Sequence, residues 1–407
     1  MSFFFYSFNK ILTMSMLSLT LSDAHLSIIK AIYFNKIVSS LEISKVTGAS
    51  IPTITKHIEE LISGGYIVEK GFAQSTSGRR PVVYSLVADR NYILSVAMDQ
   101  FYTRMVIADL SGTFVTVITE TEINLNEDSS ALDKLIAEIN AFITASGIDR
   151  SKIFAAGISM PGFVDVKDGN NRSFLHTKGT TLREQLTHDL DLPVFIDNDS
   201  SVIALAELKF GIGKTNSEAM VINLSWGIGL GIIINSKIYR GFKGYAGEFS
   251  HIPIFDNDKI CSCGKRGCLE TQASLITIED SALEEINNGA FTSLKIEEGK
   301  VDITAVITEA MKGDSLSIKL LSYAGYQIGR AIAILIHILN PEKIVLSGRA
   351  SKAGKFLLPP VQQAITDYSI PTITEGTEII ISNMGFDAQL IGSAALAVEH
   401  ISKEFFV

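Results

Sequence analysis

Cysteines and long hydrophobic segments are both scarce in this chain. Its 407 residues include three cysteines, all between positions 261 and 268. Three thiols so close together cannot build a disulfide framework, and they favour metal ligation in a reducing cytoplasm. No segment has the roughly 20 consecutive apolar residues that a membrane-spanning helix requires. We therefore expect a cytoplasmic protein without a membrane partner.

Charged residues make up only 19% of the chain, and their signs are unevenly distributed. Residues 24–90 contain eight lysines or arginines against five acidic residues, a net charge of +3, whereas the whole chain carries −9. A basic front on an acidic body suits a module that binds an anionic polymer such as DNA. The length also exceeds what one compact core accommodates, so two or three domains are expected.

Residues 1–23 form an N-terminal extension whose role the sequence leaves open. Lys10 precedes an apolar stretch, as in a signal peptide, but serine and threonine interrupt that stretch and no small-residue cleavage site follows. We therefore do not expect secretion. An additional helix, or translation that starts at Met14 or Met16, are the alternatives.

Residues 24–64 have the pattern of three short helices. Apolar residues recur at helical spacing over 24–34, Gly48 marks the end of a second short helix, and Ser50 can cap the start of a third. A short helix, a glycine-containing turn and a second amphipathic helix are typical of helix-turn-helix proteins. The expected buried face of the third helix consists of Ile51, Ile54, Ile58, Leu61 and Ile62.

Two short strands follow, separated by a loop with the sequence AQSTSGRRP. Such a hairpin is the wing beside a recognition helix, so residues 24–90 are predicted to form a winged helix-turn-helix domain. Small or basic side chains on the third helix can reach base edges, and wing arginines can reach phosphates or a narrow minor groove. A winged helix used only for protein contacts is the alternative. The expected DNA contacts are Ser50, Thr53, Thr55 and Lys56, with His57 on the same face, and Arg79 and Arg80 on the wing.

From about residue 92 the sequence alternates between strands and helices. Three expected strands over 92–123 precede an amphipathic helix and a buried strand, and a similar set of strands begins near residue 218. This repetition predicts an α/β body with the two-lobed actin-like or hexokinase-like (ribonuclease H-like) fold of ATPases. We place the first lobe at 91–204 and the second at 205–407, with a C-terminal helix that can return to the first lobe.

The cysteines form the pattern C-x-C-x4-C, and Gly264 and Gly267 supply tight turns between them. Neighbouring thiols so close in sequence cannot form an unstrained disulfide, and a histidine lies ten residues upstream. A Cys₃His set closes a tetrahedral zinc site, which makes the metal structural. Three buried free thiols are the alternative. The expected zinc ligands are His251, Cys261, Cys263 and Cys268.

The stretch 248–270 resembles the signature of the ROK family, which includes sugar kinases and sugar-responsive repressors. The resemblance extends to PGFVD at 161–165, NDSS at 198–201, GIGLG at 227–231 and NPEKIVLSG at 340–348. The winged helix with its GRRP loop is similar to the regulator branch of that family. The resemblance implies sugar contacts from Asn198, Asp199, Glu248, His251 and Glu270.

In this implied site, His251 binds zinc through one ring nitrogen and faces the sugar with the other. Carboxylates and amides offer the acceptors and donors that a polyol needs. Other roles remain open: Asp199 can cap the following helix, which is compatible with a sugar contact, and Glu248 and Glu270 can instead support the zinc loop.

Two loops depart from the pattern of the family's kinases. In an active kinase Asp199 would be the general base, and a D-x-G-G-T hairpin would cradle phosphate with its backbone N–H groups. Here Phe101 and Tyr102 replace both glycines, and Trp226 replaces a threonine before G-I-G. These departures predict that ATP does not bind productively and that the protein is not an enzyme.

Residues 171–186 are a second region of difference. Family kinases carry an asparagine and often a tryptophan there, neither of which we identify, although His176 lies nearby. The identity of the sugar is therefore open.

We predict a sugar-responsive transcriptional regulator, in the simplest case a repressor, that binds double-stranded operator DNA. Its effector would be a sugar, amino sugar or sugar phosphate, and its assembly a homodimer or homotetramer. One alternative is a ROK-type hexose kinase with a DNA-binding appendage. The other is a regulator that a partner protein controls.

Overall fold

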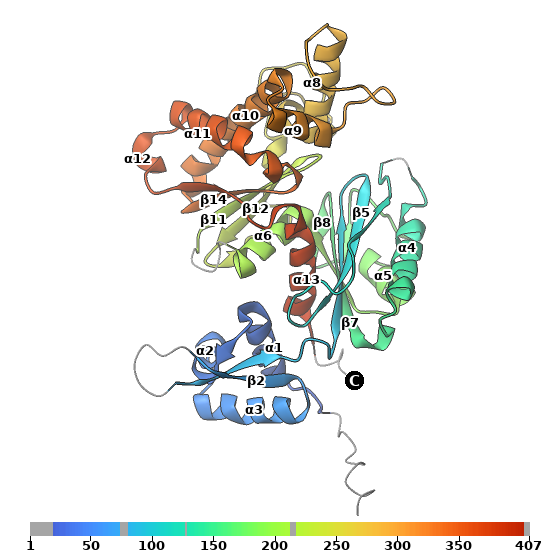
Figure 1. Cartoon of the computed structure of the whole chain (residues 1–407), viewed down its shortest axis with the longest axis vertical. Helices are drawn as coiled ribbons and strands as arrows, with labels where there is room; N and C mark the ends of the chain where they lie inside the picture. Colours follow the sequence, from blue (N-terminus) through green and yellow to red (C-terminus); the bar gives the residue numbers. More distant parts are fainter. Residues whose placement is uncertain (1–18, 74–79, 127, 212–216, 403–407) are drawn as a thin grey trace, which may run out of the picture.

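The computed structural model describes residues 19–73, 80–126, 128–211 and 217–402. Figure 1 shows a small N-terminal domain below two larger α/β lobes. Residues 1–18, most of the predicted extension, lie outside the described residues, and Ser22 caps the first helix. Among the helices in the described ranges, none combines the length and apolar character needed to cross a membrane.

The N-terminal domain consists of three helices and a three-stranded antiparallel sheet, which confirms the predicted winged helix-turn-helix fold. Its elements are α1 (Asp23–Asn35), β1 (Val38–Ser39), α2 (Ser40–Thr47), α3 (Ile51–Ser63), β2 (Ile67–Phe72) and β3 (Val82–Leu86), with the sheet order β1-β3-β2. Ser50 caps α3, and Gly48 ends α2 with a φ of 74°. The expected buried face of α3 was wrong at Ile51, which is 45% exposed because it lies in the first turn, beyond the core that surrounds Ile54, Ile58 and Leu61.

The first lobe is a five-stranded sheet with helices on both faces. Its strands, in spatial order, are β6 (Thr119–Glu122), β5 (Tyr102–Asp109), β4 (Tyr92–Met98), β7 (Ile153–Met160) and β10 (Val194–Asn198). The strands β4, β7 and β10 run parallel, whereas β5 and β6 are antiparallel. Two helices, α4 (Ala131–Ser146) and α5 (Leu182–Leu190), cover one face through their leucines and isoleucines. A small hairpin of β8 (Val164–Asp165) and β9 (Asn170–Asn171) lies beside the end of β10.

The second lobe repeats this topology. Its strands, in spatial order, are β13 (Lys237–Ile238), β12 (Ile228–Ile234), β11 (Ala219–Leu224), β14 (Lys343–Ser347) and β15 (Glu378–Ile381). Three antiparallel strands are again followed by two parallel ones, so the predicted duplicated fold is confirmed. The outer layer contains α7 (Glu270–Ala273), α8 (Leu275–Asn287), α9 (Ile303–Lys312), α10 (Ser315–Leu339), α11 (Gly354–Tyr368) and α12 (Pro371–Thr374).

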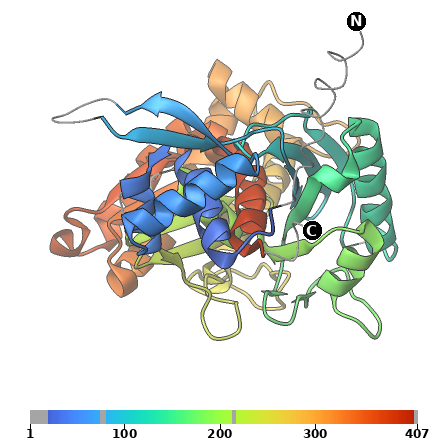
Figure 2. The same ribbon diagram turned by 90° about the horizontal axis from the view of Figure 1, so that it is seen from below.

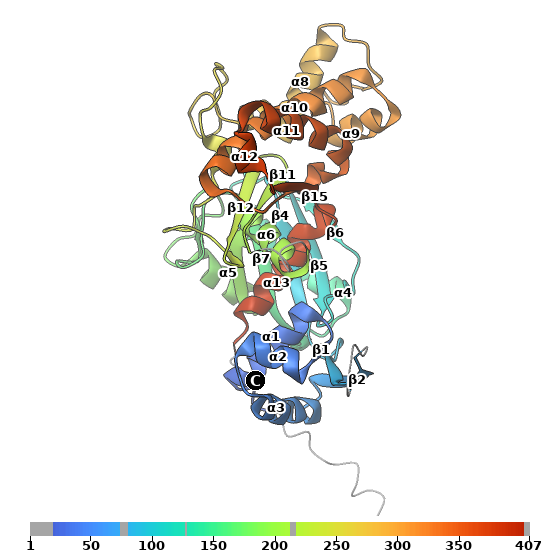
Figure 3. The same ribbon diagram turned by 90° about the vertical axis from the view of Figure 1, so that its left-hand side faces the viewer.

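Two helices lie between the sheets of the lobes, α6 (Asp199–Phe210) and α13 (Ala388–His400), as Figures 1 and 3 show. The C-terminal helix α13 packs on β4, β7 and β10, so the end of the chain returns to the first lobe. The boundary that we expected between residues 204 and 205 falls inside α6. This helix is unbroken and contacts strands of both lobes. The whole of α6, and not a single peptide bond, is therefore the connection between the lobes.

The N-terminal domain shares a hydrophobic core with the body. Apolar side chains of α1 and α3 cluster with Phe154 of β7 and with Ala394, Ala397 and Val398 of α13. Seen from below in Figure 2, the helices of this domain lie over the end of α13. The N-terminal domain is therefore packed against the body.

Candidate functional site

A cavity of about 380 Å³ opens between the two lobes. Its wall combines backbone from the glycine-containing turn at 161–164 with side chains from the start of α6, the β11–β12 turn and the zinc loop. All five residues that the sequence implied for a sugar line this cavity: Asn198, Asp199, Glu248, His251 and Glu270. Segments 22 to 71 residues apart in sequence thus bring their carboxylates to one place, which is the kind of lining that a polyol requires.

The N-terminus of α6 supplies two of these residues, and the alternative in which Asp199 caps this helix was wrong. Asn198, not Asp199, is the N-cap of α6, because its Oδ1 accepts hydrogen bonds from the amides of Ser200 at 3.0 Å and Ser201 at 3.2 Å. Its amide nitrogen donates to Gly162 O at 3.1 Å. Most of the hydrogen-bonding capacity of Asn198 therefore fixes the cavity wall.

Asp199 is held with its carboxylate at the cavity. Its Oδ1 accepts the Ser200 amide at 2.7 Å, and its Oδ2 accepts the amide nitrogen of Asn223 at 3.2 Å. Burial raises the pKa of Asp199 to about 6, and nearby Asp99 adds to this rise while the hydrogen bonds from Ser200 oppose it. A carboxylate with such a pKa is ionised at neutral pH and binds hydroxyl donors well.

Glu248 also lines the cavity, where it forms an acidic group with Asp199 and Glu270. Burial raises its pKa to about 7, with further contributions from the negative charges of Asp199 and Glu270. Glu248 therefore gains from hydrogen-bond donors that share the negative charge gathered around it. A ligand rich in hydroxyl groups supplies such donors.

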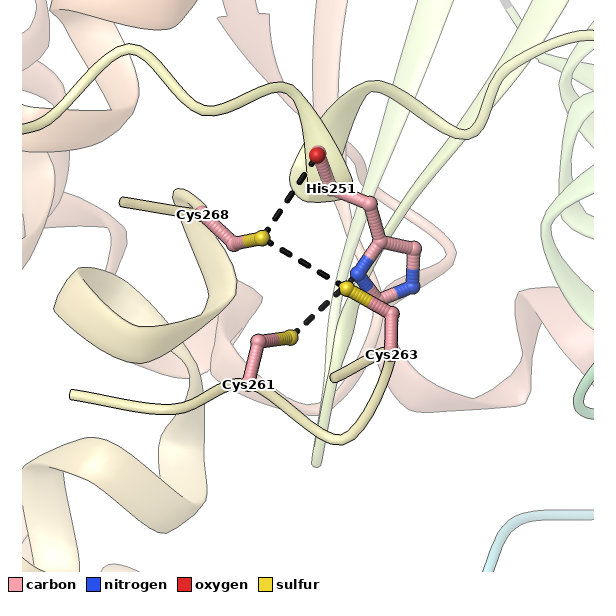
Figure 4. A group of neighbouring side chains, drawn as sticks. All are labelled: His251, Cys261, Cys263 and Cys268. Atoms are coloured by element: carbon pink, nitrogen blue, oxygen red, sulfur yellow. Dashed lines mark hydrogen bonds between the residues drawn. The ribbon is translucent and has the colours of Figure 1, made fainter. Parts of the chain in front are cut away.

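The predicted zinc ligands converge in a knuckle between residues 251 and 268 (Figure 4). All four ligand atoms lie within 4.8 Å of one another. Gly264 and Gly267 have φ angles of 79° and 77°, and a side chain on Gly267 would collide with the carbonyl of Phe255. The glycines therefore allow the tight turns that bring the thiols together.

The spacing of the donors fits a tetrahedral zinc ion. Zinc–sulfur bonds of about 2.3 Å place two thiolates roughly 3.8 Å apart. Cys263 Sγ lies 3.6 Å from Cys268 Sγ, and Cys261 Sγ lies 3.4 Å from His251 Nδ1. Burial and the neighbouring thiols raise the pKa of Cys268 to about 12. The Cys268 thiol therefore needs a nearby cation to ionise at neutral pH. The site is compatible with structural zinc.

The zinc knuckle also shapes the cavity wall. With Nδ1 of His251 toward the cysteines, its Nε2 faces Glu248 Oε2 at 4.0 Å. Glu270 Oε1 accepts a hydrogen bond from Ser262 Oγ at 3.0 Å, next to the ligand Cys261. Two of the implied sugar contacts therefore take their positions from the metal loop.

The hairpin that departs from the kinase pattern is closed by contacts between the lobes. Asp99 Oδ1 accepts the amides of Phe101 and Tyr102 at 2.8 and 2.7 Å. Its Oδ2 accepts Trp226 Nε1 at 3.0 Å and Arg349 Nη2 at 3.1 Å, both from the second lobe. The ring of Phe101 packs edge-on against Trp226, with centroids 5.2 Å apart. We call Asp99, Phe101, Trp226 and Arg349 the interlobe latch.

In the interlobe latch, the carboxylate of Asp99 accepts hydrogen bonds from the backbone N–H groups of the hairpin. A phosphate cradle would offer those same N–H groups to a ligand anion. Sequence reasoning missed Arg349, which enters from the loop after β14 and lies over Trp226 and Phe386. Its only sequence signal is its position after the LSG turn.

The glycines of the GIGLG segment have a packing role. A side chain on Gly229 would collide with Ser200, and one on Gly231 would collide with Ala204, both in α6. These glycines therefore let β12 approach the helix closely.

Three further residues that sequence reasoning missed hold the cavity together. Asp197, which is buried, accepts Arg240 Nη2 at 2.6 Å and Arg240 Nε at 3.1 Å, and this ion pair joins β10 to the second lobe. Asn171 donates to Pro161 O and accepts the amides of Ser173 and Phe174, which both line the cavity. The segment 171–186 thus does contain an asparagine that shapes the pocket, whereas His176 is not part of the lining.

The expected DNA contacts lie at the start of α3 and on the wing. Ser50, Thr53, Lys56 and Arg80 are exposed, and Thr55 is half-buried with its hydroxyl bonded to Ile51 O. Arg79 lies outside the described residues. His57 does not point outward as expected, because its Nδ1 lies 3.1 Å from His25 Nε2 and 2.9 Å from Glu60 Oε2. This histidine joins α3 to α1.

Comparison with known proteins places both parts of the chain. The model of the ROK family matches residues 103–400, and that of a winged helix-turn-helix DNA-binding domain matches residues 21–68. The xylose repressor of Bacillus spizizenii is 28% identical over 92% of this chain and 94% of its own length. A glucokinase of Halalkalibacterium halodurans is 34% identical over 61% of this chain and 77% of its own length.

A solved structure resembles the whole chain, including the N-terminal domain. The crystal structure of a ROK family transcriptional regulator, a homolog of the E. coli MLC protein, superposes with a TM-score of 0.74. The two chains are 28% identical, and the match covers 94% of this chain and 97% of the other.

Proposed function

Because the chain belongs to the ROK family and begins with a winged helix-turn-helix domain, we propose that it is a sugar-responsive transcriptional repressor. The observation that carries this proposal is the combination of an exposed recognition helix with a polyol-type cavity in one packed unit. Residues 24–90 would bind the DNA, and the lobes at 91–204 and 205–407 would bind the sugar.

DNA binding would use the N-terminal face of α3 and the wing. Lys56, whose side chain is 72% exposed, and Arg80 would contact phosphates, with Arg79 beside them. Ser50, Thr53 and Thr55 would lie nearest the base edges. Two or four copies would present their helices to half-sites separated by one or more helical turns of about 34 Å.

The effector would occupy the cavity between the lobes. Asp199, Glu248 and Glu270 would accept hydrogen bonds from hydroxyl groups, with the remaining amide proton of Asn198 and the outer nitrogen of His251 as donors. Phe163, which contacts Tyr245 with ring centroids 5.3 Å apart, lines the same cavity and offers an apolar surface to a sugar ring. The negative charge of the site favours a neutral sugar over a sugar phosphate.

The body would act as a receptor rather than a kinase. A general base at Asp199 needs a phosphoryl donor held in line with the sugar. Here Phe101 and Tyr102 stand where the kinase pattern has glycines, and Phe101 packs against Trp226, which replaces a threonine. These aromatic side chains occupy the loops that would hold phosphate, so nucleotide binding would be disfavoured.

Zinc would be the structural cofactor. His251, Cys261, Cys263 and Cys268 complete a tetrahedral set, which leaves no open position for a catalytic water. The ion would fix the knuckle from which His251 and Glu270 face the sugar.

The test has two arms on the intact, zinc-loaded chain. In the first arm, binding sequences are selected from random DNA, and their affinity is measured by fluorescence anisotropy with and without xylose, glucose, N-acetylglucosamine and their phosphates. In the second arm, the same sugars are incubated with MgATP and examined by ³¹P NMR. We expect specific DNA binding that one sugar weakens, and no phosphorylated sugar.

Other outcomes identify the alternatives. A phosphorylated sugar would establish a kinase with a DNA-binding appendage. DNA binding that no sugar changes, but that a cellular protein reverses, would establish control by a protein partner. Failure to select any DNA would exclude a regulator.

A further inference from the structure

Helix α1 of the DNA-binding domain lies across the ends of α6 and α13, the two helices between the lobes. Figures 1 and 3 show these ends directly above the N-terminal domain. The other end of α6 forms part of the sugar cavity, since Asp199 is its first residue. With 12 residues, α6 spans about 18 Å between the cavity and α1.

Aromatic rings make the contact between α6 and α1. Phe210, the last residue of α6, packs against Tyr33 and Phe34 of α1, with ring centroids 6.0 and 5.8 Å apart. The ammonium group of Lys36 lies 4.9 Å from the ring of Phe210, and that of Lys209 lies 4.7 Å from the ring of Phe34. Interlocked rings and cations of this kind transmit a displacement, because the close-packed interface cannot deform continuously.

A separate set of contacts joins α1 to α13. Lys30 Nζ donates to the carbonyl of Glu399 at 2.8 Å, and the apolar side of α1 packs on Ala394, Ala397 and Val398. Lys209 of α6 forms an ion pair of 3.0 Å with Glu399. The ends of the two helices therefore meet at α1.

The two helices are anchored mainly to different lobes, although α6 also contacts β7 and β10 of the first lobe. Helix α6 is held by the second lobe through Asn223, which bonds Asp199 and Ser200, and through Ser382, which donates to the buried Glu207. The tight glycine contacts with β12 add to this anchoring.

Helix α13 is held by the first lobe. Gln389 donates to Met98 O at 2.9 Å, and Ser393 donates to Val96 O at 3.0 Å. Where the helices cross, Gly392 of α13 has no side chain of its own and lies directly against the backbone and side chain of Val202 in α6. Such a crossing permits the small sliding movements of packed helices that accompany domain closure.

We infer that α1 detects the position of α6 relative to α13, and that sugar occupancy reaches the DNA-binding domain through Phe210. This inference rests on the proposed function. A sugar that draws the lobes together moves α6 with the second lobe, while α13 stays with the first. Because α1 contacts the ends of both helices, a movement of α6 relative to α13 forces α1 either to rotate or to lose its contact with one of the two helices. The recognition helix follows α1, since His25 and His57 connect α1 to α3.

The test is a double-ligand cycle on the full, zinc-loaded chain. DNA affinity is measured without sugar and with saturating sugar, and sugar affinity is measured with and without DNA, for wild type, Phe210→Ala and Phe210→Leu. A coupled pair of sites changes affinity by about 5- to 150-fold, and the change is the same in both directions. We expect Phe210→Ala to bind sugar alone and DNA alone within about threefold of wild type, with coupling reduced to near one. Phe210→Leu keeps apolar volume without the ring, and its coupling should lie between those of wild type and Phe210→Ala.

Phe195→Leu is the matched control. Phe195 is a half-buried ring at the same junction, but it lies on β10 and stacks on His400 of α13. We expect this variant to keep the wild-type coupling. Circular dichroism and thermal melting verify that all variants are folded.

Wild-type coupling in folded Phe210→Ala would overturn the inference, as would an equal loss of coupling in Phe195→Leu. Absence of sugar or DNA binding by the wild type would instead overturn the proposed function. The two failures are therefore distinguishable.

Discussion

The indole N–H of Trp226 donates to the carboxylate of Asp99 at 3.0 Å, across the boundary between the lobes. These residues are 127 positions apart, and each lies in a turn that departs from the pattern of an active kinase. Phe101 and Arg349 complete the contact, so this hairpin joins the two lobes. The cavity beside it, where we propose that the sugar binds, remains open.

Removing the indole donor should destabilise this joint. Trp226→Phe keeps an aromatic ring against Phe101 but leaves Asp99 with one donor fewer. Hydrogen bonds to charged groups contribute about 1.5–3 kcal/mol, so we expect the free energy of unfolding to fall by about that amount. Urea denaturation followed by circular dichroism measures it. Tyr239→Phe, at an exposed position, is the control and should change stability by less than about 0.5 kcal/mol. Equal stability of Trp226→Phe and wild type would show that the latch contributes nothing.

Sugar binding should depend on the protonation of Asp199. Its pKa of about 6 lies above the ordinary value, so the folded protein holds this proton more tightly than the unfolded chain does. The group therefore favours the folded state at low pH, and this contribution is lost as the pH rises through 6. Sugar hydroxyls prefer the ionised form, so we expect sugar affinity to fall as the pH is lowered from 7.5 to about 5. Calorimetric titration measures this change. Asp199→Asn should bind weakly and with a flatter pH profile, and a wild-type affinity that is constant over this range would contradict the assigned role.

Metal loss should affect the sugar response. Cys263 is the exposed member of the zinc set, so Cys263→Ser removes a ligand without a cavity in the core. We expect metal content to drop from about one zinc per chain to nearly none, together with a lower Tm and no thermal shift with sugar. Elemental analysis and a thermal-shift assay measure these changes, with Lys265→Gln, at an exposed position of the same loop, as control. A variant that keeps both its stability and its sugar response would disprove the zinc assignment.

The ion pair between Asp197 and Arg240 offers a test of how the lobes are joined. Arg240→Met leaves the buried carboxylate of Asp197 without its partner, and breaking a buried pair costs about 3–5 kcal/mol. The double variant Asp197→Asn with Arg240→Met removes the orphan charge, so it should recover part of this loss. Chemical denaturation of the three proteins gives the comparison. A double variant no more stable than Arg240→Met would show that the charge is not the cause.

Lys56 should contribute to DNA affinity irrespective of sequence. A lysine that neutralises one phosphate changes the slope of log K against log salt by about 0.9, so Lys56→Gln should flatten the slope by roughly one unit. Lys312→Gln, at an exposed position on α9 of the second lobe, is the control and should leave the slope unchanged. Anisotropy titrations between 50 and 200 mM salt, roughly the range in which such slopes are resolved, decide the point.

Features that are local in sequence could be predicted, whereas those that depend on tertiary contacts could not. The zinc ligands lie within 18 residues and the caps Ser50 and Gly48 within three, so spacing alone indicated both. Arg349 and Asp99 are 250 residues apart, and their meeting depends on the packing of two lobes. The same holds for Arg240 and Asp197.

Two errors have a common physical cause. Helical periodicity placed His57 on the outer face and Ile51 on the inner face of α3. Neighbouring elements decide otherwise, because His25 and Glu60 hold His57 inward, while the core ends before it reaches Ile51. Periodicity gives the direction of a side chain from its own helix and not the extent of the surface that meets it.

A single titration tests the central claim that this body is a receptor for sugar and the N-terminal domain its output. A selected DNA duplex is bound to wild type and to Asp199→Asn, and sugar is added while anisotropy is recorded. We expect the sugar to release wild type from DNA at concentrations about tenfold or more below those needed for Asp199→Asn, in the absence of ATP. Release of both proteins at the same sugar concentration, or release of wild type only when MgATP is present, would contradict the claim.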